Sequence, residues 1–301
     1  MVDAVLVVEK PIGPTSHDVV RTIRRAASQK RVGHTGTLDP AATGVLVACL
    51  GRATKLVPYL QAGRKTYAAQ MVLGVETDSQ DADGAEVARH DASHIDERSL
   101  CEALTRFQGD ILQVPPMVSA LKVGGERLHA KARRGETVER EPRPVTVDDL
   151  VLDAFEPGET AHASFLVTCS AGTYVRTIAH DVGEALGVGG SLIGLRRLAN
   201  GPFVVDEAHT IEEVEAAAAE GRFPTLLLEP LDAVRRIMPV VEVEDPELAR
   251  RLTQGGRVPA ADRDAVFAAV MGPRLLGIYR AERVGDPARP ELVWTRPEEL
   301  T

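Results

Sequence analysis

The sequence has few cysteines and few aromatic residues. Its three cysteines, Cys49, Cys101 and Cys169, lie far apart and form no C-x-x-C pair, which argues against a zinc knuckle or a disulfide scaffold. We expect them to be buried free thiols in a reducing compartment. Aromatic residues make up only 4% of the chain, which argues against a broad aromatic sheet for stacking single-stranded RNA.

Long apolar runs are also missing. Nothing approaches the roughly 20 consecutive apolar residues that cross a bilayer. The apolar run near the N-terminus, residues 4–8, ends at Glu9 and Lys10 and is too short for a secretion signal, so it predicts a buried strand. The sequence therefore predicts a cytoplasmic protein without a membrane partner.

The motifs of several common enzyme classes are absent. There is no P-loop ending, dinucleotide fingerprint, H-E-x-x-H or G-x-S-x-G motif. The acidic stretch 77–84 hints at a calcium loop, but the alignment puts His90 where an EF-hand needs its bidentate glutamate. The sequence predicts neither a metal site nor a cofactor.

The 301 residues suggest about two domains. Hydrophobic residues make up 44% of the chain and charged residues 26%, as in soluble globular proteins. Helical and strand-like patterns mix without a regular βαβ repeat, which favours an α+β fold. Helices are expected at 18–27 (with Ser16 as N-cap), 96–107, 174–186, 211–219 and 246–252; strands are expected at 66–73, 163–169, 192–198, 240–243, 266–270 and 275–279, and residues 45–50 read as a strand or a helix start.

Composition changes at two places along the chain. Residues 122–144 are polar, basic and interrupted by glycine and proline, which predicts an inserted basic arm. Residues 224–239 have the composition of a linker, and the segment 240–301 after it reads as a small β-rich domain.

Charge is spread unevenly. The net charge of −9 excludes a uniformly basic nucleic-acid binder. Residues 19–67, however, hold nine basic residues and a single acid, Asp39. A charge run is usually only a solvated face. Because its one acid falls in the most unusual motif of the chain, we interpret this block as a polyanion site with a carboxylate at its centre.

That motif is the glycine-rich stretch 33–44. Its glycines allow positive φ angles and a close approach of backbone to ligand, and Pro40 biases Asp39 toward an extended or turn conformation. The stretch could also be a plain structural loop in which Asp39 only forms a turn.

Two further stretches carry candidate ligand-binding groups. Residues 170–181 read as a strand end, a glycine corner and a helix start, so Tyr174 and Arg176 would lie where anions bind. Tyr67 begins a strand beside Arg64 and Lys65 and is a candidate platform for stacking a base. The alternatives are an exposed arginine and partly buried core tyrosines.

Six motifs follow one another along the chain: K-P-x-G-x-T-S at 10–16, G-H-T-G-T-L-D-P at 33–40, T-D-x-x-D-x-D-G at 77–84, P-P-M-x-S-A-L-K at 115–122, G-T-Y-x-R at 172–176 and L-R-R at 195–197. In this order they resemble the bacterial tRNA pseudouridine-55 synthases, the TruB family. The resemblance covers roughly residues 5–235, and the tail resembles that family's PUA-like RNA-binding module. Val118 and the stretch 128–133 depart from the family pattern, in or beside the basic arm.

The resemblance implies a pseudouridine-synthase core of α+β class, with a curved mixed β-sheet and flanking helices, over residues 1–235. A PUA-like domain would follow at 240–301. It implies isomerisation of uridine 55 in the tRNA T loop, without cofactor or metal, by a monomer that needs no protein partner. Its implied residues are Asp39 as catalytic aspartate, Tyr67 stacking on the target base, Tyr174 and Arg176 in the active site, with Arg176 pairing with Asp39, Leu195 lining the pocket, His34 contacting the T loop, and Arg64, Lys65 and Lys122 on the RNA backbone.

Several points stay open at the level of sequence. The ionised Asp39 could act as nucleophile at C1′ or as base at C2′. Burial would raise the pKa of Asp39, and a paired Arg176 would lower it. The same fold could also serve as an RNA chaperone. A third possibility is a carboxylate-based hydrolase that uses Asp39 and Asp78 as a pair.

Overall fold

The computed structural model describes residues 2–119, 121–123, 125–128, 134, 136, 138–259 and 266–300. The helices are α1 (Ser16–Ala26), α2 (Val57–Gln61), α3 (Glu97–Thr105), α5 (Val175–Ala185), α6 (Ile211–Ala219), α7 (Pro230–Ile237) and α8 (Pro246–Thr253), with 3-10 turns η1 (Gly51–Leu56), η2 (Val205–Glu207), η3 (Phe223–Leu226) and η4 (Pro297–Glu299). The strands are β1 (Ala4–Lys10), β2 (Val32–His34), β3 (Thr43–Leu50), β4 (Lys65–Leu73), β5 (Val75–Thr77), β6 (Glu86–Arg89), β7 (Gly109–Gln113), β8 (Lys122–Val123), β9 (Glu126–Arg127), β10 (Arg143–Glu156), β11 (Ala161–Cys169), β12 (Gly190–Asn200), β13 (Phe203–Val204), β14 (Val240–Glu242), β15 (Val266–Met271), β16 (Arg274–Arg280) and β17 (Arg289–Val293).

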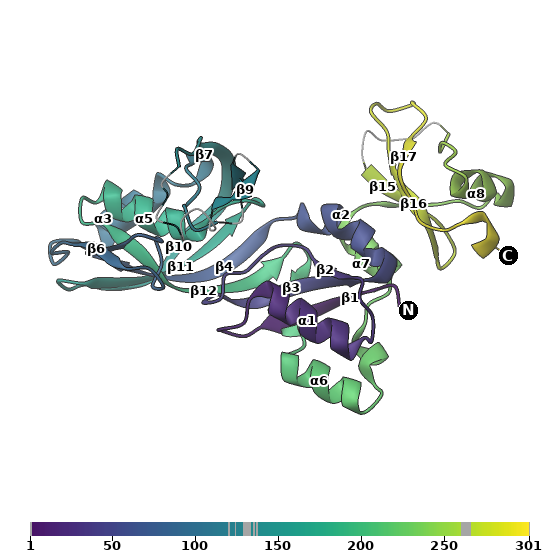
Figure 1. Cartoon of the computed structure of the whole chain (residues 1–301). Helices are drawn as coiled ribbons and strands as arrows, with labels where there is room; N and C mark the ends of the chain where they lie inside the picture. The colour runs from purple at the N-terminus through teal and green to yellow at the C-terminus, as the bar shows by residue number, and fades with distance from the viewer. Residues whose placement is uncertain are drawn as a thin grey trace.

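One nine-stranded sheet forms the body of the molecule. Its main path runs β1-β3-β12-β4-β11-β10-β7, with β2 paired to β3 and β13 to β12. All of these pairs are antiparallel except β3 with β12, so the sheet is mixed, and Figure 1 shows its long central strands bending along the body. The predicted α+β class with a mixed sheet is confirmed.

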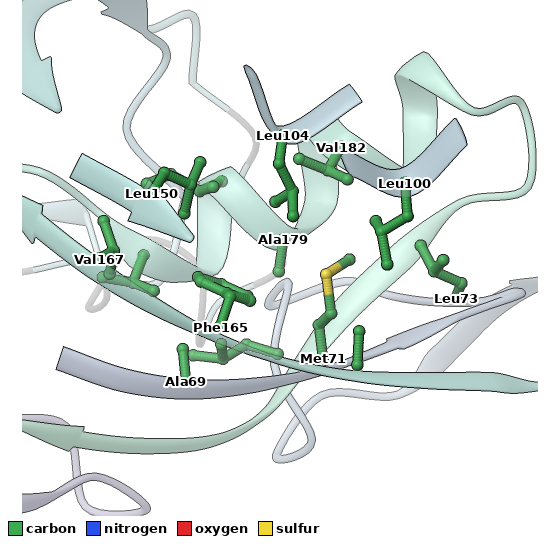
Figure 2. Close-up of a cluster of buried hydrophobic side chains, with 14 of the residues drawn as sticks. Ala69, Met71, Leu73, Leu100, Leu104, Leu150, Phe165, Val167, Ala179 and Val182 are labelled. Carbon is green, nitrogen blue, oxygen red and sulfur yellow. The ribbon is translucent and has the colours of Figure 1, made fainter. Parts of the chain in front are cut away.

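Buried and exposed side chains alternate along the strands, so one face of the sheet is covered and the other is not. Along β11 every second residue is buried, which is the period-2 pattern of a strand with one covered face. Helices α3 and α5 cover that face (Figure 1). Figure 2 shows Met71 from β4, Phe165 from β11, Leu104 from α3 and Val182 from α5 meeting in this core.

Two expectations about local structure were wrong. The residue that caps α1 is Thr15, not Ser16: its hydroxyl accepts from the Asp18 amide at 3.1 Å, while Asp18 accepts from the Thr15 amide at 3.0 Å. The predicted linker 224–239 contains helix α7. The apolar face of α7 packs on the sheet, so this segment is part of the folded core and not a flexible linker.

A second sheet follows at the C-terminal end, in the order β14-β15-β16-β17, with α8 packed beside it. This confirms the predicted β-rich tail. Figure 1 shows it beyond α2 and α7 at one end of the body. The two parts share a hydrophobic cluster, because Ala268, Leu275 and Ile278 are buried together with Leu60 and Val234.

Candidate active site

Most of the predicted site residues meet in one cleft. A cavity of about 260 Å³ opens where the glycine-rich loop, the start of β4, the start of α5 and the middle of β12 come together. Its walls are Thr35, Gly36, Thr37, Leu38, Asp39, Gln61, Lys65, Tyr67, Ser119, Ala171, Gly172, Thr173, Tyr174, Val175, Arg176, Leu192, Leu195 and Arg197. Segments more than 150 residues apart in sequence thus supply one site.

Buried polar side chains hold the loop that carries Asp39. The Ser16 hydroxyl donates to the Leu38 carbonyl at 3.0 Å and accepts from the Leu38 amide at 2.9 Å. Arg197 is 1% exposed and donates to the Gly36 carbonyl at 3.2 Å and the Val45 carbonyl at 2.7 Å. Asp39 therefore sits on a backbone fixed from two sides.

Lys10 is a third support for the same loop. Its ammonium is fully buried and donates to the carbonyls of Pro11, Pro40 and Ala42 at 2.8, 3.1 and 2.7 Å. Burial lowers the pKa of Lys10 to about 8, and the nearby charge of Asp39 opposes that shift. A buried positive charge therefore supports the loop that carries Asp39.

Arg176 joins two carboxylates. It lies in the first turn of α5 and is 5% exposed, while the Asp39 side chain keeps 45% of its surface. One guanidinium nitrogen, Nη2, donates to Asp39 Oδ2, and Nη1 donates to Asp81 Oδ2 at 2.8 Å. Asp81 is held in turn by the Ser79 hydroxyl at 2.5 Å. The predicted pairing of Arg176 with Asp39 is present in the structure.

The protonation of Asp39 reflects opposing influences. Burial in the cleft raises its pKa, Arg176 lowers it by charge and hydrogen bonding, and the neighbouring Asp81 raises it again. The net direction is upward from the ordinary value. Asp39 is thus a carboxylate close to a cation but only partly solvated, a setting that suits a nucleophile or a base.

Tyr67 and Leu195 come from neighbouring strands. In the β4–β12 register Tyr67 lies opposite Arg197, and Leu195 lies opposite Ala69. Burial raises the pKa of Tyr67, while Arg197 opposes the shift through its charge and a hydrogen bond, so the phenol stays neutral. The two side chains give the cavity an aromatic and an aliphatic wall.

Tyr174 completes the opposite wall. It is the N-cap residue of α5 and is half-buried. Burial raises the pKa of its phenol, and a hydrogen bond with the Ser119 hydroxyl opposes the rise. Ser119 belongs to the P-P-M-x-S-A-L-K stretch, so this motif reaches the site through Tyr174.

His34 lies outside the residues that line the cavity. Its ring meets the His17 ring edge-on at a centroid distance of 5.6 Å, and its Nδ1 accepts from the Gly36 amide at 3.3 Å. Burial lowers the pKa of His34, and His17 and Arg197 add to the shift. The imidazole is therefore neutral near pH 7.

The three predicted RNA-backbone residues differ. Arg64 is half-exposed at the rim and pairs with Asp148 at 2.8 Å. Lys65 is 5% exposed, and its ammonium donates to the carbonyls of Gln61 and Gly63. These bonds hold Lys65 in the cleft floor, where it also lines the cavity, and its expected contact with the RNA backbone stays a prediction. Lys122 lies in β8, and its side chain falls outside the described residues.

In the folded protein, ion pairs offset part of the positive charge of residues 19–67. Acids from outside residues 19–67 pair with several of its arginines: Asp18 with Arg21 at 3.2 Å, and Glu215 with Arg25 at 3.7 Å. Arg52 lies between Asp3 at 2.7 Å and Glu299 at 2.9 Å. The positive surface is therefore smaller than the nine residues suggest.

Asp78 does not join Asp39. Its carboxylate accepts from the Ala85 amide at 3.0 Å, within the hairpin that β5 and β6 form. The acid that reaches Arg176 is Asp81, three residues later, which the sequence interpretation had not assigned to the site. Asp81, and not Asp78, is therefore the acid that shares Arg176 with Asp39.

Sequence reasoning missed four supporting residues: Lys10, Asp81, Gln113 and Arg197. Lys10, Asp81 and Arg197 belong to the motifs given above, and Gln113 bonds to the backbone of Tyr174. The hydrogen bonds that reveal these roles join residues far apart in the sequence, so no local pattern indicates them. Among the described residues no group of three or more His, Cys, Asp or Glu side chains could hold a metal ion. In the described part of the chain no helix has the length and apolar character needed to cross a membrane.

Comparison with known proteins identifies the family. Residues 24–175 match the N-terminal domain of TruB family pseudouridylate synthases, and residues 176–237 match the tRNA pseudouridylate synthase B C-terminal domain. The tRNA pseudouridine synthase B of Symbiobacterium thermophilum is 51% identical over 251 residues, covering 83% of this chain and 82% of that protein. That of Arthrobacter sp. is 40% identical over 310 residues and covers 99% of each.

A solved structure agrees in fold over nearly the whole chain. In the crystal structure of a Cbf5-Nop10-Gar1 complex, one chain superposes with a TM-score of 0.75 at 26% identity, over 99% of this chain and 86% of that chain. Family models, close relatives and fold all lead to one assignment. The chain belongs to the TruB family of pseudouridylate synthases.

Proposed function

We propose that this protein isomerises uridine 55 in the T loop of tRNA to pseudouridine. As a member of its family it is an isomerase that makes pseudouridine in tRNA, as the names of its relatives indicate. The observation that carries the proposal is the pair formed by Asp39 and the buried Arg176 inside a cavity of about 260 Å³, which has room for one nucleobase and its sugar.

The residues of the cleft suit the steps of the reaction. The C1′–N1 bond breaks, the uracil turns, a C1′–C5 bond forms, and the proton on C5 moves to N1, so the product is an isomer of the substrate. Leaving the stack costs the target base a few kcal/mol. Stacking on Tyr67 would return about 1–3 kcal/mol. The ionised Asp39 would then attack C1′ or take a proton from C2′, and Arg176 would keep it charged.

The substitution Asp39→Asn tests the assignment. It preserves the shape of the side chain but removes the negative charge, so we expect single-turnover pseudouridine formation to fall to background. Binding of tRNA should survive or tighten slightly, because one repulsion against phosphate is gone. Asp78→Asn is the matched control and should keep wild-type turnover, since the Asp78 carboxylate bonds within its own hairpin and, among the described residues, makes no bond to Arg176.

Substantial turnover by Asp39→Asn would remove Asp39 from the catalytic role. The same variant separates catalysis from any tRNA chaperone activity, since a chaperone would still refold tRNA without the carboxylate. Mapping the product on a full tRNA transcript tests the position, because pseudouridine found elsewhere than at position 55 would contradict that part of the proposal.

We also infer a division of labour along the chain. Every residue that lines the cavity lies between positions 35 and 197, so catalysis belongs to residues 1–235. None of the described residues of the β-rich unit at 240–301 lines the cavity, and this unit would bind the body of the tRNA. Protein partners play no part in this scheme, in which one copy of the chain supplies the whole cleft.

A further inference from the structure

Gln113 lies at the end of β7, the edge strand of the large sheet. Its side chain is buried, with only 1% of the residue exposed. The side-chain Oε1 accepts from the Tyr174 amide at 2.8 Å, and Nε2 donates to the Tyr174 carbonyl at 3.0 Å. Both ends of this carboxamide are therefore committed to the backbone of one active-site residue.

That residue begins α5. Tyr174 is the N-cap residue, and its side chain makes no capping hydrogen bond. Its carbonyl also accepts from the amides of Thr177 and Ile178 at 3.1 and 3.2 Å, which are the first bonds of the helix. Helix starts need outside partners for their free backbone groups. Here Gln113 supplies the partner for the Tyr174 amide, from a strand 61 positions earlier in the chain.

The first turn of α5 carries the chemistry. Arg176 follows Tyr174 by two residues, and its guanidinium joins Asp39 and Asp81. The Tyr174 ring lines the cavity that Asp39 faces. A small rotation or slide of this turn would move both side chains, and functional groups need placement to about 0.5 Å. A displacement of about 1 Å can cost a factor of about 100 in rate.

We propose that Gln113 is a positioning residue of the active site: it fixes the Tyr174 backbone and so aims Arg176 at Asp39. This rests on the proposed function of the cleft. Gln113 is not among the residues that line the cavity, so it acts only through Tyr174 and Arg176. The Ser119 hydroxyl contacts the phenol of the same tyrosine, so one segment grips Tyr174 at its backbone and at its ring.

The test compares Gln113→Met with Gln108→Met in the full-length protein. Gln108 is the matched control, because its amide donates to the Leu150 carbonyl of β10 at 3.3 Å near the same sheet edge and not to the backbone of Tyr174. For Gln113→Met we expect single-turnover rates to fall about 100-fold. The tRNA dissociation constant, measured by filter binding, should stay within about twofold, because the phosphate contacts remain. Gln108→Met should match the wild type in both.

A second readout needs no turnover. If Arg176 moves away from Asp39, the pKa of the Asp39 carboxyl should rise further, since Arg176 lowers it by charge and by a hydrogen bond, and Lys10 adds only a smaller effect in the same direction. Carbon-13 NMR of the free protein follows this titration. We expect an upward shift in Gln113→Met and none in Gln108→Met.

These readouts can overturn the proposal. Wild-type turnover in folded Gln113→Met would do so, and so would slow turnover with an unchanged Asp39 pKa. If the methionine variant fails to fold, Gln113→Asn takes its place with the same expectations, because its neutral carboxamide is too short to reach both Tyr174 backbone groups; loss of folding in both would show a structural role instead. If the wild type itself made no pseudouridine, the proposed function would fail, while the NMR comparison would still decide the role of Gln113.

Discussion

At the scale of single residues, Arg176 controls the charge of the site. It is almost fully buried and bonds to both Asp39 and Asp81. A bidentate guanidinium can serve two carboxylates at once, which an ammonium cannot do with the same geometry. Its removal leaves Asp39 next to Asp81 without the cation that separates their charges.

Arg176→Ala should therefore change the pH profile in a defined direction. Arg176 lowers the pKa of Asp39, so its loss raises that pKa, and the ionised fraction at a given acidic pH falls. The acidic limb of the pH–rate profile should move to higher pH, and turnover should drop about 100-fold or more at every pH. Single-turnover rates between pH 5 and 9 measure both effects.

Arg176→Lys separates charge from geometry. The ammonium still lowers the pKa of Asp39, so the acidic limb should move less than in Arg176→Ala, while turnover stays low because the fork is lost. Arg21→Lys, on the exposed surface of α1, is the control and should behave as wild type. An unshifted acidic limb in Arg176→Ala would contradict the assignment of that limb to Asp39.

At the scale of elements, the glycine-rich loop owes its position to glycine as well as to side chains. Gly44 has φ = +100°, and a Cβ there would overlap the Arg197 carbonyl and lie 2.8 Å from the Arg197 amide. Arg197 is the residue that holds the loop at Gly36. Gly44 thus permits the close parallel contact between β3 and β12.

Gly44→Ala should destabilise the protein more than Gly13→Ala. Gly13 is the matched control: its φ is +103°, but a Cβ there meets nothing within 4 Å. Backbone strain alone costs about 1–3 kcal/mol of the free energy of unfolding. Gly44→Ala adds a clash between backbones and should also lower turnover by shifting Arg197. Urea unfolding measures the free energy of unfolding of both variants. Equal losses would show that the contact between β3 and β12 adjusts to the added methyl group without a further cost.

Local elements were the most predictable part of this molecule. The helix at 211–219 was predicted with its bounds from its run of alanines and glutamates, and the structure shows that Thr210 and Glu213 cap it with a capping box. Asp39 and Arg176 were predicted because the loop and the helix start are local signals. Ser16 was misread as a cap, since its true partner, Leu38, lies 22 residues away. Asp81 and Arg197 act over even longer separations, which no local pattern reveals.

At the scale of the whole molecule, charge and domain structure both depend on distant segments. The basic block appeared uniform because its acidic partners Asp18, Glu215, Asp148 and Glu299 all lie outside residues 19–67. The composition of residues 224–239 predicted a linker. Instead this segment contains α7, which packs between the large sheet and the C-terminal sheet. The interface is apolar at its centre and has Arg52 at its edge.

Truncation after residue 239 should therefore affect stability as well as RNA binding. It removes Ala268, Leu275 and Ile278 from the cluster that also buries Leu60 and Val234, so apolar surface on α2 and α7 becomes exposed. The loss of a few kcal/mol would lower the melting temperature of the remaining chain by about 5–10 °C. The truncated chain still contains every described residue that lines the cavity, so below its melting temperature we expect the cleft to be formed.

We expect truncated protein that remains folded to modify a minimal T stem-loop but to bind full tRNA more weakly. Arg52→Gln in the full chain is the companion variant, because it breaks the ion pairs to Asp3 and Glu299 while leaving the apolar contact in place. It should shift the melting temperature much less, since partly exposed ion pairs contribute little. Calorimetry and single-turnover assays on both RNAs measure these effects. Loss of all stem-loop activity in a truncated chain that remains folded would mean that the C-terminal unit takes part in catalysis, because the cleft itself would be intact.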